Sequence, residues 1–150
     1  MLIPKGALIG LGLGIIGAAI IGIYFTNLAN QVSPLVYVNG PSLSILTDKA
    51  NFKLGENIKI RIINSGTVPL TFSDLSYGLR IVGLDGRVIF SPMSAQVISV
   101  LEPKEEKEFF WNQTKSDGGK IIDGRYKILT KTMAGGDNVL EKSTTINILK

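Results

Sequence analysis

The stretch NIKIRIIN, residues 57–64, decides the fold. Isoleucines at every second position, Ile58, Ile60 and Ile62, alternate with a lysine and an arginine. Successive side chains of a β-strand point to opposite faces of a sheet, so this alternation predicts a strand with one buried face and one solvated face. No segment after residue 30 shows the helical spacing of three and four residues over any length. The chain beyond residue 30 is therefore predicted to consist of strands and turns.

Eight further segments have the composition and the alternation of short strands. They are Leu43–Leu46, Leu70–Phe72, Leu79–Leu84, Arg87–Phe90, Val97–Leu101, Glu108–Trp111, Tyr126–Thr132 and Thr144–Leu149. Turn signals rich in glycine, proline, asparagine and aspartate separate them. Short strands with frequent turns predict a mainly β fold, namely an immunoglobulin-like antiparallel β-sandwich.

Two turns add detail to this expectation. LDGR, residues 84–87, lies between two apolar runs, and its Asp-Gly pair favours a type I′ turn, so a hairpin is predicted there. DGRYKI, residues 123–128, places Tyr126 at the start of a late strand just after a turn. A tyrosine in this position predicts a tyrosine corner, in which the hydroxyl group bonds back to the backbone.

The N-terminal part of the chain has a different character. Residues 7–25 read ALIGLGLGIIGAAIIGIYF and carry no charge. As a helix with a rise of about 1.5 Å per residue, this run spans roughly 28 Å, close to the thickness of the hydrocarbon core of a bilayer. Glycine is common in membrane helices, and Tyr24 falls where an aromatic ring suits the interface. The run predicts one transmembrane α-helix inserted in a lipid bilayer.

Charge gives the expected orientation. Lys5 precedes the apolar run, and no charged residue follows until Asp48. The positive-inside rule then puts the N-terminus in the cytoplasm. We expect a transmembrane anchor at residues 1–26, a linker at 27–41 and an extracytoplasmic β-sandwich at 42–150. The protein would thus be a single-pass protein of the cell membrane.

The N-terminal run has other interpretations. A cleaved signal peptide is disfavoured, because the run is long and no good A-x-A site follows it. Lys5 and Gly6 before the run resemble the processing site of archaeal pilin-type signals, where cleavage would follow Gly6. GLGIIG, residues 12–17, matches the dinucleotide-binding pattern G-x-G-x-x-G. That pattern needs a strand before it and an acid about 20 residues later, whereas the first carboxylate here is Asp48, so no cofactor is expected.

Small residues recur at every fourth position of the apolar run. They are Gly6, Gly10, Gly14, Ala18 and Gly22. Residues four apart lie on one face of a helix, and a stripe of small side chains lets a neighbouring helix approach closely. The stripe predicts a helix-packing face whose partner is either a second copy of this chain or another membrane protein.

The composition excludes several kinds of chemistry. The chain of 150 residues has no cysteine and no histidine, so disulfides, thiol chemistry, the common catalytic triads and type 1 copper sites are excluded. After residue 26 the chain carries 15 basic and 12 acidic residues, since only Lys5 comes earlier, and the basic residues are scattered. We therefore predict a non-catalytic protein without a metal or a nucleic-acid partner.

Two surface features remain. NQT, residues 112–114, is a glycosylation sequon, and it makes Asn112 an acceptor if this part of the chain lies outside the membrane. FFW, residues 109–111, places Phe110 on the face opposite to Phe109 and Trp111. One of these faces is expected to fill the core. Either Phe110 or the other two aromatics would then be available to anchor a partner protein.

Residues 52–130 resemble a known family. FKLGENIKIRIINSGTVPLTF, YGLRIVGLDGRVIFS and LEPKEEKEFFWNQTKSDGGKIIDGRYKI are similar to the BsuPI-type domain in its F-x-x-G-E lead, its Asp-Gly hairpin, its L-x-P-x-E turn, its tryptophan and its closing G-x-Y. The resemblance implies an immunoglobulin-like sandwich of the kind named for an intracellular proteinase inhibitor. It also implies protease inhibition as a function.

Three functions are compatible with these features. The first is an accessory or structural subunit of a membrane or cell-envelope complex, with a helix that packs and a sandwich that binds protein. The second is a filament or stator component of an archaellum-like or pilus-like system. The third is a membrane-anchored protease inhibitor.

Overall fold

The computed structural model describes residues 18–25, 34–134 and 138–150. The chain divides into two compact units, Met1–Gln31 and Val32–Lys150. In the first unit, residues 18–25 form a helix whose side chains are exposed. Among the described residues, no helix is both long and apolar enough to cross a membrane. Most of the run expected to be a transmembrane helix lies outside the described residues.

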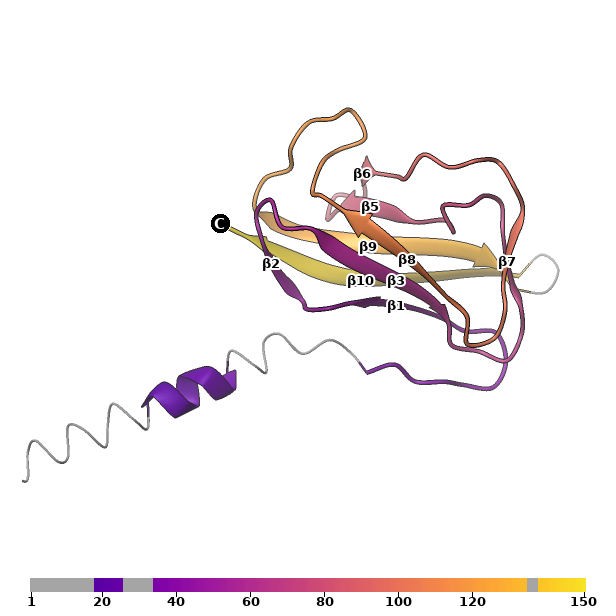
Figure 1. Ribbon diagram of the computed structural model, residues 1–150, viewed down its shortest axis with the longest axis horizontal. Coiled ribbons are helices and arrows are strands. Elements are labelled where there is room, and N and C mark those ends of the chain that lie inside the picture. Colours follow the sequence, from indigo (N-terminus) through magenta and orange to yellow (C-terminus); the bar gives the residue numbers. More distant parts are fainter. Residues whose placement is uncertain (1–17, 26–33, 135–137) are drawn as a thin grey trace, which may run out of the picture. The chain divides into compact units, whose positions relative to one another are not determined.

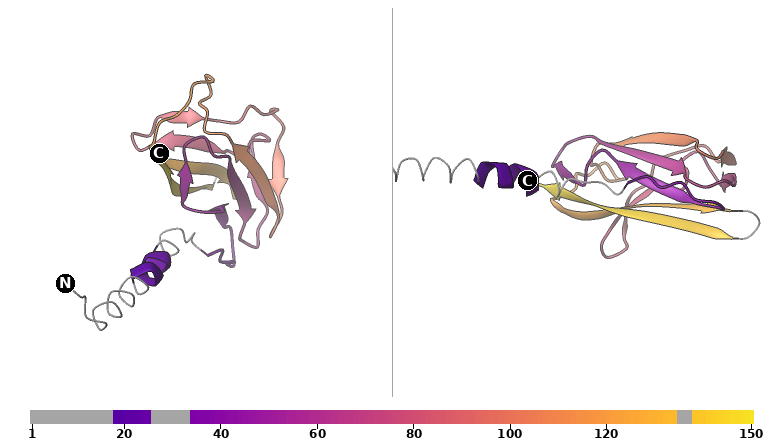
Figure 2. Two further views of the ribbon diagram at one scale, coloured as in Figure 1. Left: turned by 60° about the vertical axis from the view of Figure 1, so that its left-hand side comes forward. Right: turned by 90° about the horizontal axis from the view of Figure 1, so that it is seen from below.

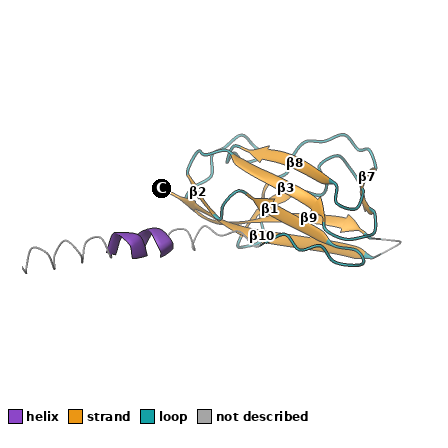
Figure 3. Ribbon diagram, turned by 60° about the horizontal axis from the view of Figure 1, so that its bottom comes forward, coloured by secondary structure: helices purple, strands orange, loops and turns teal. Residues whose placement is uncertain are grey.

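The second unit is a β-sandwich of two sheets (Figures 1 and 2). One sheet has the order β1 (Leu43–Thr47), β3 (Ile58–Asn64) and β8 (Glu106–Trp111), and Figure 3 shows these strands side by side. The other sheet has the order β2 (Asn51–Lys53), β10 (Val139–Leu149), β9 (Gly124–Met133), β4 (Leu70–Phe72) and β7 (Ser99–Leu101). The strand β5 (Arg80–Gly83) also pairs with β9, and β6 (Val88–Phe90) pairs with β5. The right-hand view of Figure 2 shows the two layers from the side.

The stretch that predicted a strand forms β3, at the centre of the first sheet. Ile58, Ile60 and Ile62 are each 0% exposed, while Lys59 and Arg61 lie on the outer face, as the alternation predicted. Burying such a side chain contributes roughly 1.5–3 kcal/mol. The inner face of β9 supplies the opposite wall of the core with a tyrosine, an isoleucine and two threonines. The β-sandwich expected from the sequence is thus confirmed.

The pairing differs from a purely antiparallel arrangement at one edge. Strand β2 runs parallel to the end of β10, with Asn51 opposite Asn147 and Phe52 opposite Ile148. The Nδ2 of Asn147 donates to the Oδ1 of Asn51 at 2.7 Å, and Phe52 is buried. The sequence did not predict β2, because three residues are too few to show an alternation.

The hairpin expected at LDGR forms between β5 and β6, but its turn is of another type. The amide of Gly86 donates to the carbonyl of Gly83 at 3.0 Å, and Gly86 has a φ of 80°. Leu84 and Asp85 have no positive φ, whereas a type I′ turn needs one at both central residues. The geometry is that of a type I turn followed by a left-handed glycine, and the register of β5 and β6 shifts beyond it.

Two short strands of the second sheet, β4 and β5, lie along the same neighbour with a break between them. Both β4 and β5 pair with β9, and residues 73–79 connect them. Within this connection Tyr77 turns into the core, with its ring 5.0 Å from that of Phe72. A Cβ atom added to Gly78 would lie 2.3 Å from the carbonyl oxygen of Lys131, so only glycine allows this close approach. The interruption leaves a cleft over the outer face of the sheet.

Candidate functional site

Only part of the small-residue stripe can be placed. Gly6, Gly10 and Gly14 lie outside the described residues. Ala18 and Gly22 lie on one face of the helix of residues 18–25. A Cβ atom added to Gly22 would meet nothing within 4 Å.

The three aromatics at the end of β8 have different surroundings. Trp111 is 1% exposed, its ring stacks on Phe90 and meets the edge of Tyr126, and its Nε1 donates to the carbonyl of Thr114 at 2.8 Å. Phe109 is partly buried against the core. Phe110 is 66% exposed on the opposite face. Trp111 therefore fills the core and is not available as an anchor for a partner, and Phe110 is the exposed member of the three.

The expected tyrosine corner is present. The hydroxyl group of Tyr126 donates to the carbonyl of Ile122 at 2.9 Å, four residues back along the chain. Tyr126 is 8% exposed and lies against Trp111. The hydrogen bond ties the long connection between β8 and β9, which Figure 1 shows as a loop, to the core.

The sequon begins the same connection. Asn112 is exposed, and its Oδ1 accepts the hydroxyl of Thr114 at 2.6 Å and the amide of Thr114 at 3.3 Å. The middle residue of the sequon, Gln113, is 2% exposed and has a φ of 61°. The local bend thus presents Asn112 outward and turns Gln113 inward.

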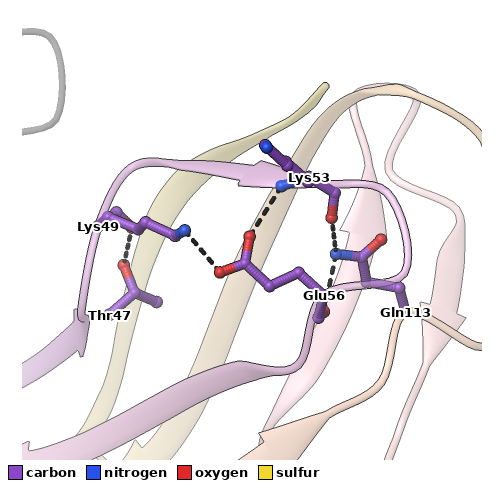
Figure 4. Close-up of polar contacts among 5 residues, drawn as sticks. All are labelled: Thr47, Lys49, Lys53, Glu56 and Gln113. Atoms are coloured by element: carbon purple, nitrogen blue, oxygen red, sulfur yellow. Dashed lines mark hydrogen bonds and ion pairs between the residues drawn. The ribbon is translucent and has the colours of Figure 1, made fainter. Parts of the chain in front are cut away.

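Gln113 holds a distant turn, and sequence reasoning missed this role. Its Oε1 accepts a hydrogen bond from the amide of Gly55 at 2.8 Å. Its Nε2 donates to the carbonyls of Lys53 at 2.8 Å and Glu56 at 2.9 Å, as Figure 4 shows. The side chain thereby satisfies three backbone groups of the turn between β2 and β3. A sequence gives no signal for such a role, because the partners lie 57 to 60 residues away.

Glu56 belongs to the same turn. Its carboxylate forms an ion pair with the ammonium group of Lys49 and accepts a hydrogen bond from the amide of Lys53 (Figure 4). The hydrogen bond from Lys49, followed by that from the backbone of Lys53, holds the pKa of Glu56 below its usual value. These contacts are local and structural, since they join the turn before β2 to the turn after it.

The outer face of the β1–β3–β8 sheet carries balanced charges. Lys59 pairs with Glu108, and Arg61 pairs with Glu106 across neighbouring strands. Phe110 lies directly opposite Lys59 at the end of this face. Exposed ion pairs of this kind contribute about 0–1 kcal/mol each. We call this surface the balanced face.

The outer face of the other sheet carries unbalanced charges. Arg80 on β5 and Arg125, Lys127 and Lys131 on β9 are exposed and point to this side, because they alternate with buried residues. None of these four cations forms an ion pair with a carboxylate of residues 34–134 or 138–150. Glu141 of β10 is opposite Lys131 in the register of the two strands, but their side chains form no ion pair. We call this surface the basic face.

A cleft of about 420 Å³ opens on the basic face. Arg80 and Lys131 line it together with the hydroxyl-bearing Thr71, Ser73 and Ser91. The exposed apolar side chains of Ile98, Met133 and Val139 also belong to the lining. The sequence did not predict this site, because Arg80 and Lys131 are far apart in the chain. The pairing of β5 with β9 brings their strands together.

Asp74 also lines the cleft, but its carboxylate is occupied. The Oδ1 accepts the hydroxyl of Ser76 and, at 2.8 Å, the amide of Ser76, and the hydroxyls of Ser73 and Ser94 donate to the same carboxylate. The hydrogen bond from the Ser76 hydroxyl is the largest of the causes that hold the pKa of Asp74 below its usual value. The carboxylate of Asp74 thus fixes the conformation of the connection between β4 and β5.

In residues 18–25, 34–134 and 138–150, no three of the side chains that bind metals come together. The sequence matches no known protein family, and no curated protein is significantly similar to it. Function must therefore be inferred from the two units of the chain themselves.

Proposed function

We propose that the protein is a non-catalytic, single-pass membrane protein that serves as an accessory subunit of a membrane or cell-envelope complex. The observation that carries the proposal is the uncharged run of residues 7–25 ahead of a compact unit with its own hydrophobic core. The run suits a bilayer, and the core is large enough for the second unit to fold as a domain without disulfides. In this proposal the N-terminus lies in the cytoplasm and the sandwich lies outside.

The sandwich is proposed to be immunoglobulin-like and of the BsuPI type. The bond from Tyr126 to Ile122 supports this, since a tyrosine that caps a late strand is typical of immunoglobulin-like domains. Domains of this architecture commonly bind other proteins through their loops and sheet faces, which is the role proposed here.

Substitutions in the small-residue stripe test the membrane part of the proposal. Gly14→Leu would fill the packing face, so we expect it to reduce the recovery of a membrane partner on purification in mild detergent several-fold. Gly12→Leu is the matched control, because in the proposed helix, with about 100° per residue, Gly12 would lie on nearly the opposite side from Gly14. The measurement is quantitative mass spectrometry of the proteins that co-purify with the tagged chain.

The outcomes discriminate between the alternatives. Equal recovery of every partner with both variants would rule out packing through the stripe. The lysine and glycine ahead of the apolar run favour the second candidate function, a component of an archaellum-like or pilus-like system. In that case the mature protein begins at Ala7, which mass spectrometry of its N-terminal peptide detects directly.

A further inference from the structure

We propose that the cleft on the basic face binds an acidic segment of a partner protein that also carries aliphatic side chains. This inference rests on the proposed function, because it assigns the partner-binding surface of the sandwich. The cleft lies wholly within the second unit, between the interrupted strands and β9.

Charge is the first argument. The two outer faces of the sandwich differ, since the cations of the balanced face are paired with glutamates, whereas the cations of the basic face are not paired with any described carboxylate. The carboxylate of Asp74 in the cleft is already bound by serine donors, and Glu141 stands beside Lys131 as the acid of β10 on this face. Arg80, Arg125, Lys127 and Lys131 thus leave an excess of positive charge. Complementary charge guides association and selects partners.

The lining of the cleft gives the second argument. Ile98, Met133 and Val139 are 74%, 55% and 55% exposed around it, so a ligand that covers them gains apolar contacts as well as ion pairs. The aromatic residue in the described lining is Phe72, which is 2% exposed and offers no ring for a sugar to stack on. A flat lipid surface does not enter a concave site. An acidic and aliphatic peptide matches both the charges and the apolar rim.

The test uses the full chain in mild detergent. The probe is a short fluorescein-labelled peptide with two glutamates for each leucine, and binding is followed by fluorescence anisotropy. We expect the double variant Arg80→Ser/Lys131→Ser to bind on the order of tenfold more weakly. The double variant Lys59→Ser/Arg61→Ser is the matched control, because it removes the same charge from the balanced face and should bind as the unmodified chain does.

A further variant separates the two arguments. Ile98→Ser keeps every charge and removes an exposed aliphatic side chain, so it should weaken binding several-fold. Unchanged binding by Ile98→Ser would overturn the apolar part of the proposal. Equal weakening by the two double variants would overturn the site, since it would indicate unspecific attraction by net charge.

Competing ligands complete the test. Stronger binding to vesicles of anionic lipid or to a polyuronate than to the peptide would also overturn the proposal. Circular dichroism confirms that each variant is folded, which is expected because the substituted side chains are exposed or, for Lys59 and Arg61, half-buried on an outer face. If the peptide does not bind while the Gly14→Leu variant still loses a membrane partner, the cleft is refuted and the proposed function stands.

Discussion

Gln113 shows how one side chain can determine the conformation of a loop. It adopts a left-handed backbone conformation, and it is nearly inaccessible to solvent. A left-handed conformation is uncommon for glutamine, so the three hydrogen bonds to the turn at residues 53–56 must offset its cost. The residue lies between Asn112 and Thr114 of the sequon, and so its bonds also fix the orientation of Asn112.

Removing this side chain should destabilise the sandwich. We expect Gln113→Ala to lower the free energy of unfolding by about 2 kcal/mol, because it leaves backbone groups of the turn without partners. Gln96→Ala makes the same chemical change at an exposed position and should have almost no effect. Urea unfolding followed by circular dichroism measures both. Similar losses for the two variants would contradict the role of Gln113.

Asp74 makes stability depend on pH. Its pKa is lowered in the folded protein, chiefly by the Ser76 hydroxyl, so the unfolded chain takes up a proton at a higher pH than the folded chain does. The stabilisation is therefore present above the ordinary value of about 3.9 and is lost as the pH falls through the folded value. Asp74→Asn should cost about 1 kcal/mol near neutral pH, and this difference should shrink toward about pH 3.

The measurement is the urea midpoint of both proteins across that pH range. Ser76→Ala removes the main donor and should act in the same direction as Asp74→Asn. A constant difference between the unmodified chain and Asp74→Asn at every pH would show that the carboxylate is not stabilised by folding.

At the scale of elements, the segment before β1 is hydrogen-bonded to the turn between β3 and β4. The amide of Val38 donates to the carbonyl of Ser65, and the amide of Thr67 donates to the carbonyl of Gly40, both at 2.9 Å. A Cβ atom added to Gly66 would lie 2.2 Å from the carbonyl oxygen of Gly40. The close approach of two backbones therefore requires glycine at position 66.

Two glycine substitutions should differ in cost for this reason. We expect Gly66→Ala to destabilise the protein by roughly 3 kcal/mol, since backbone atoms must move apart. Gly86→Ala introduces a strained φ in open space and should cost about 1 kcal/mol. Hydrogen exchange at the amides of Val38 and Thr67 should accelerate in the Gly66→Ala variant alone. Acceleration in both variants, or in neither, would contradict the docking.

The strands show what a sequence reveals about a sheet. Strand β3 was predicted because one of its faces is buried and the other is solvated, which produces the alternation. The first half of β10 was not predicted, and its residues Val139–Ser143 are exposed or half-buried on both faces. Where neither face is buried, the sequence has no reason to alternate. The turn at Gly86 was misassigned because an Asp-Gly pair suits more than one type of turn.

At the scale of the whole molecule, the distribution of charge could not be predicted from the sequence. Basic residues that are scattered along the chain gather on one outer face when β5 and β9 pair, while the other face combines each cation with an acid. The interruption between β4 and β5 that makes the cleft depends on Gly78 and on the inward turn of Tyr77. The sequence around Gly78 and Tyr77 gives no sign of this role, because it depends on the approach of β9.

The parallel contact of β2 with β10 has a mechanical consequence. The amide of Asn147 donates to the carbonyl of Ala50, and the amide of Leu54 donates to the carbonyl of Leu149. In parallel strands, a pull on the start of β2 and on the end of β10 acts along the strands in opposite directions, so their hydrogen bonds are sheared together and do not open one by one. Tension between the start of β2 and the C-terminus is thus borne by several bonds at once.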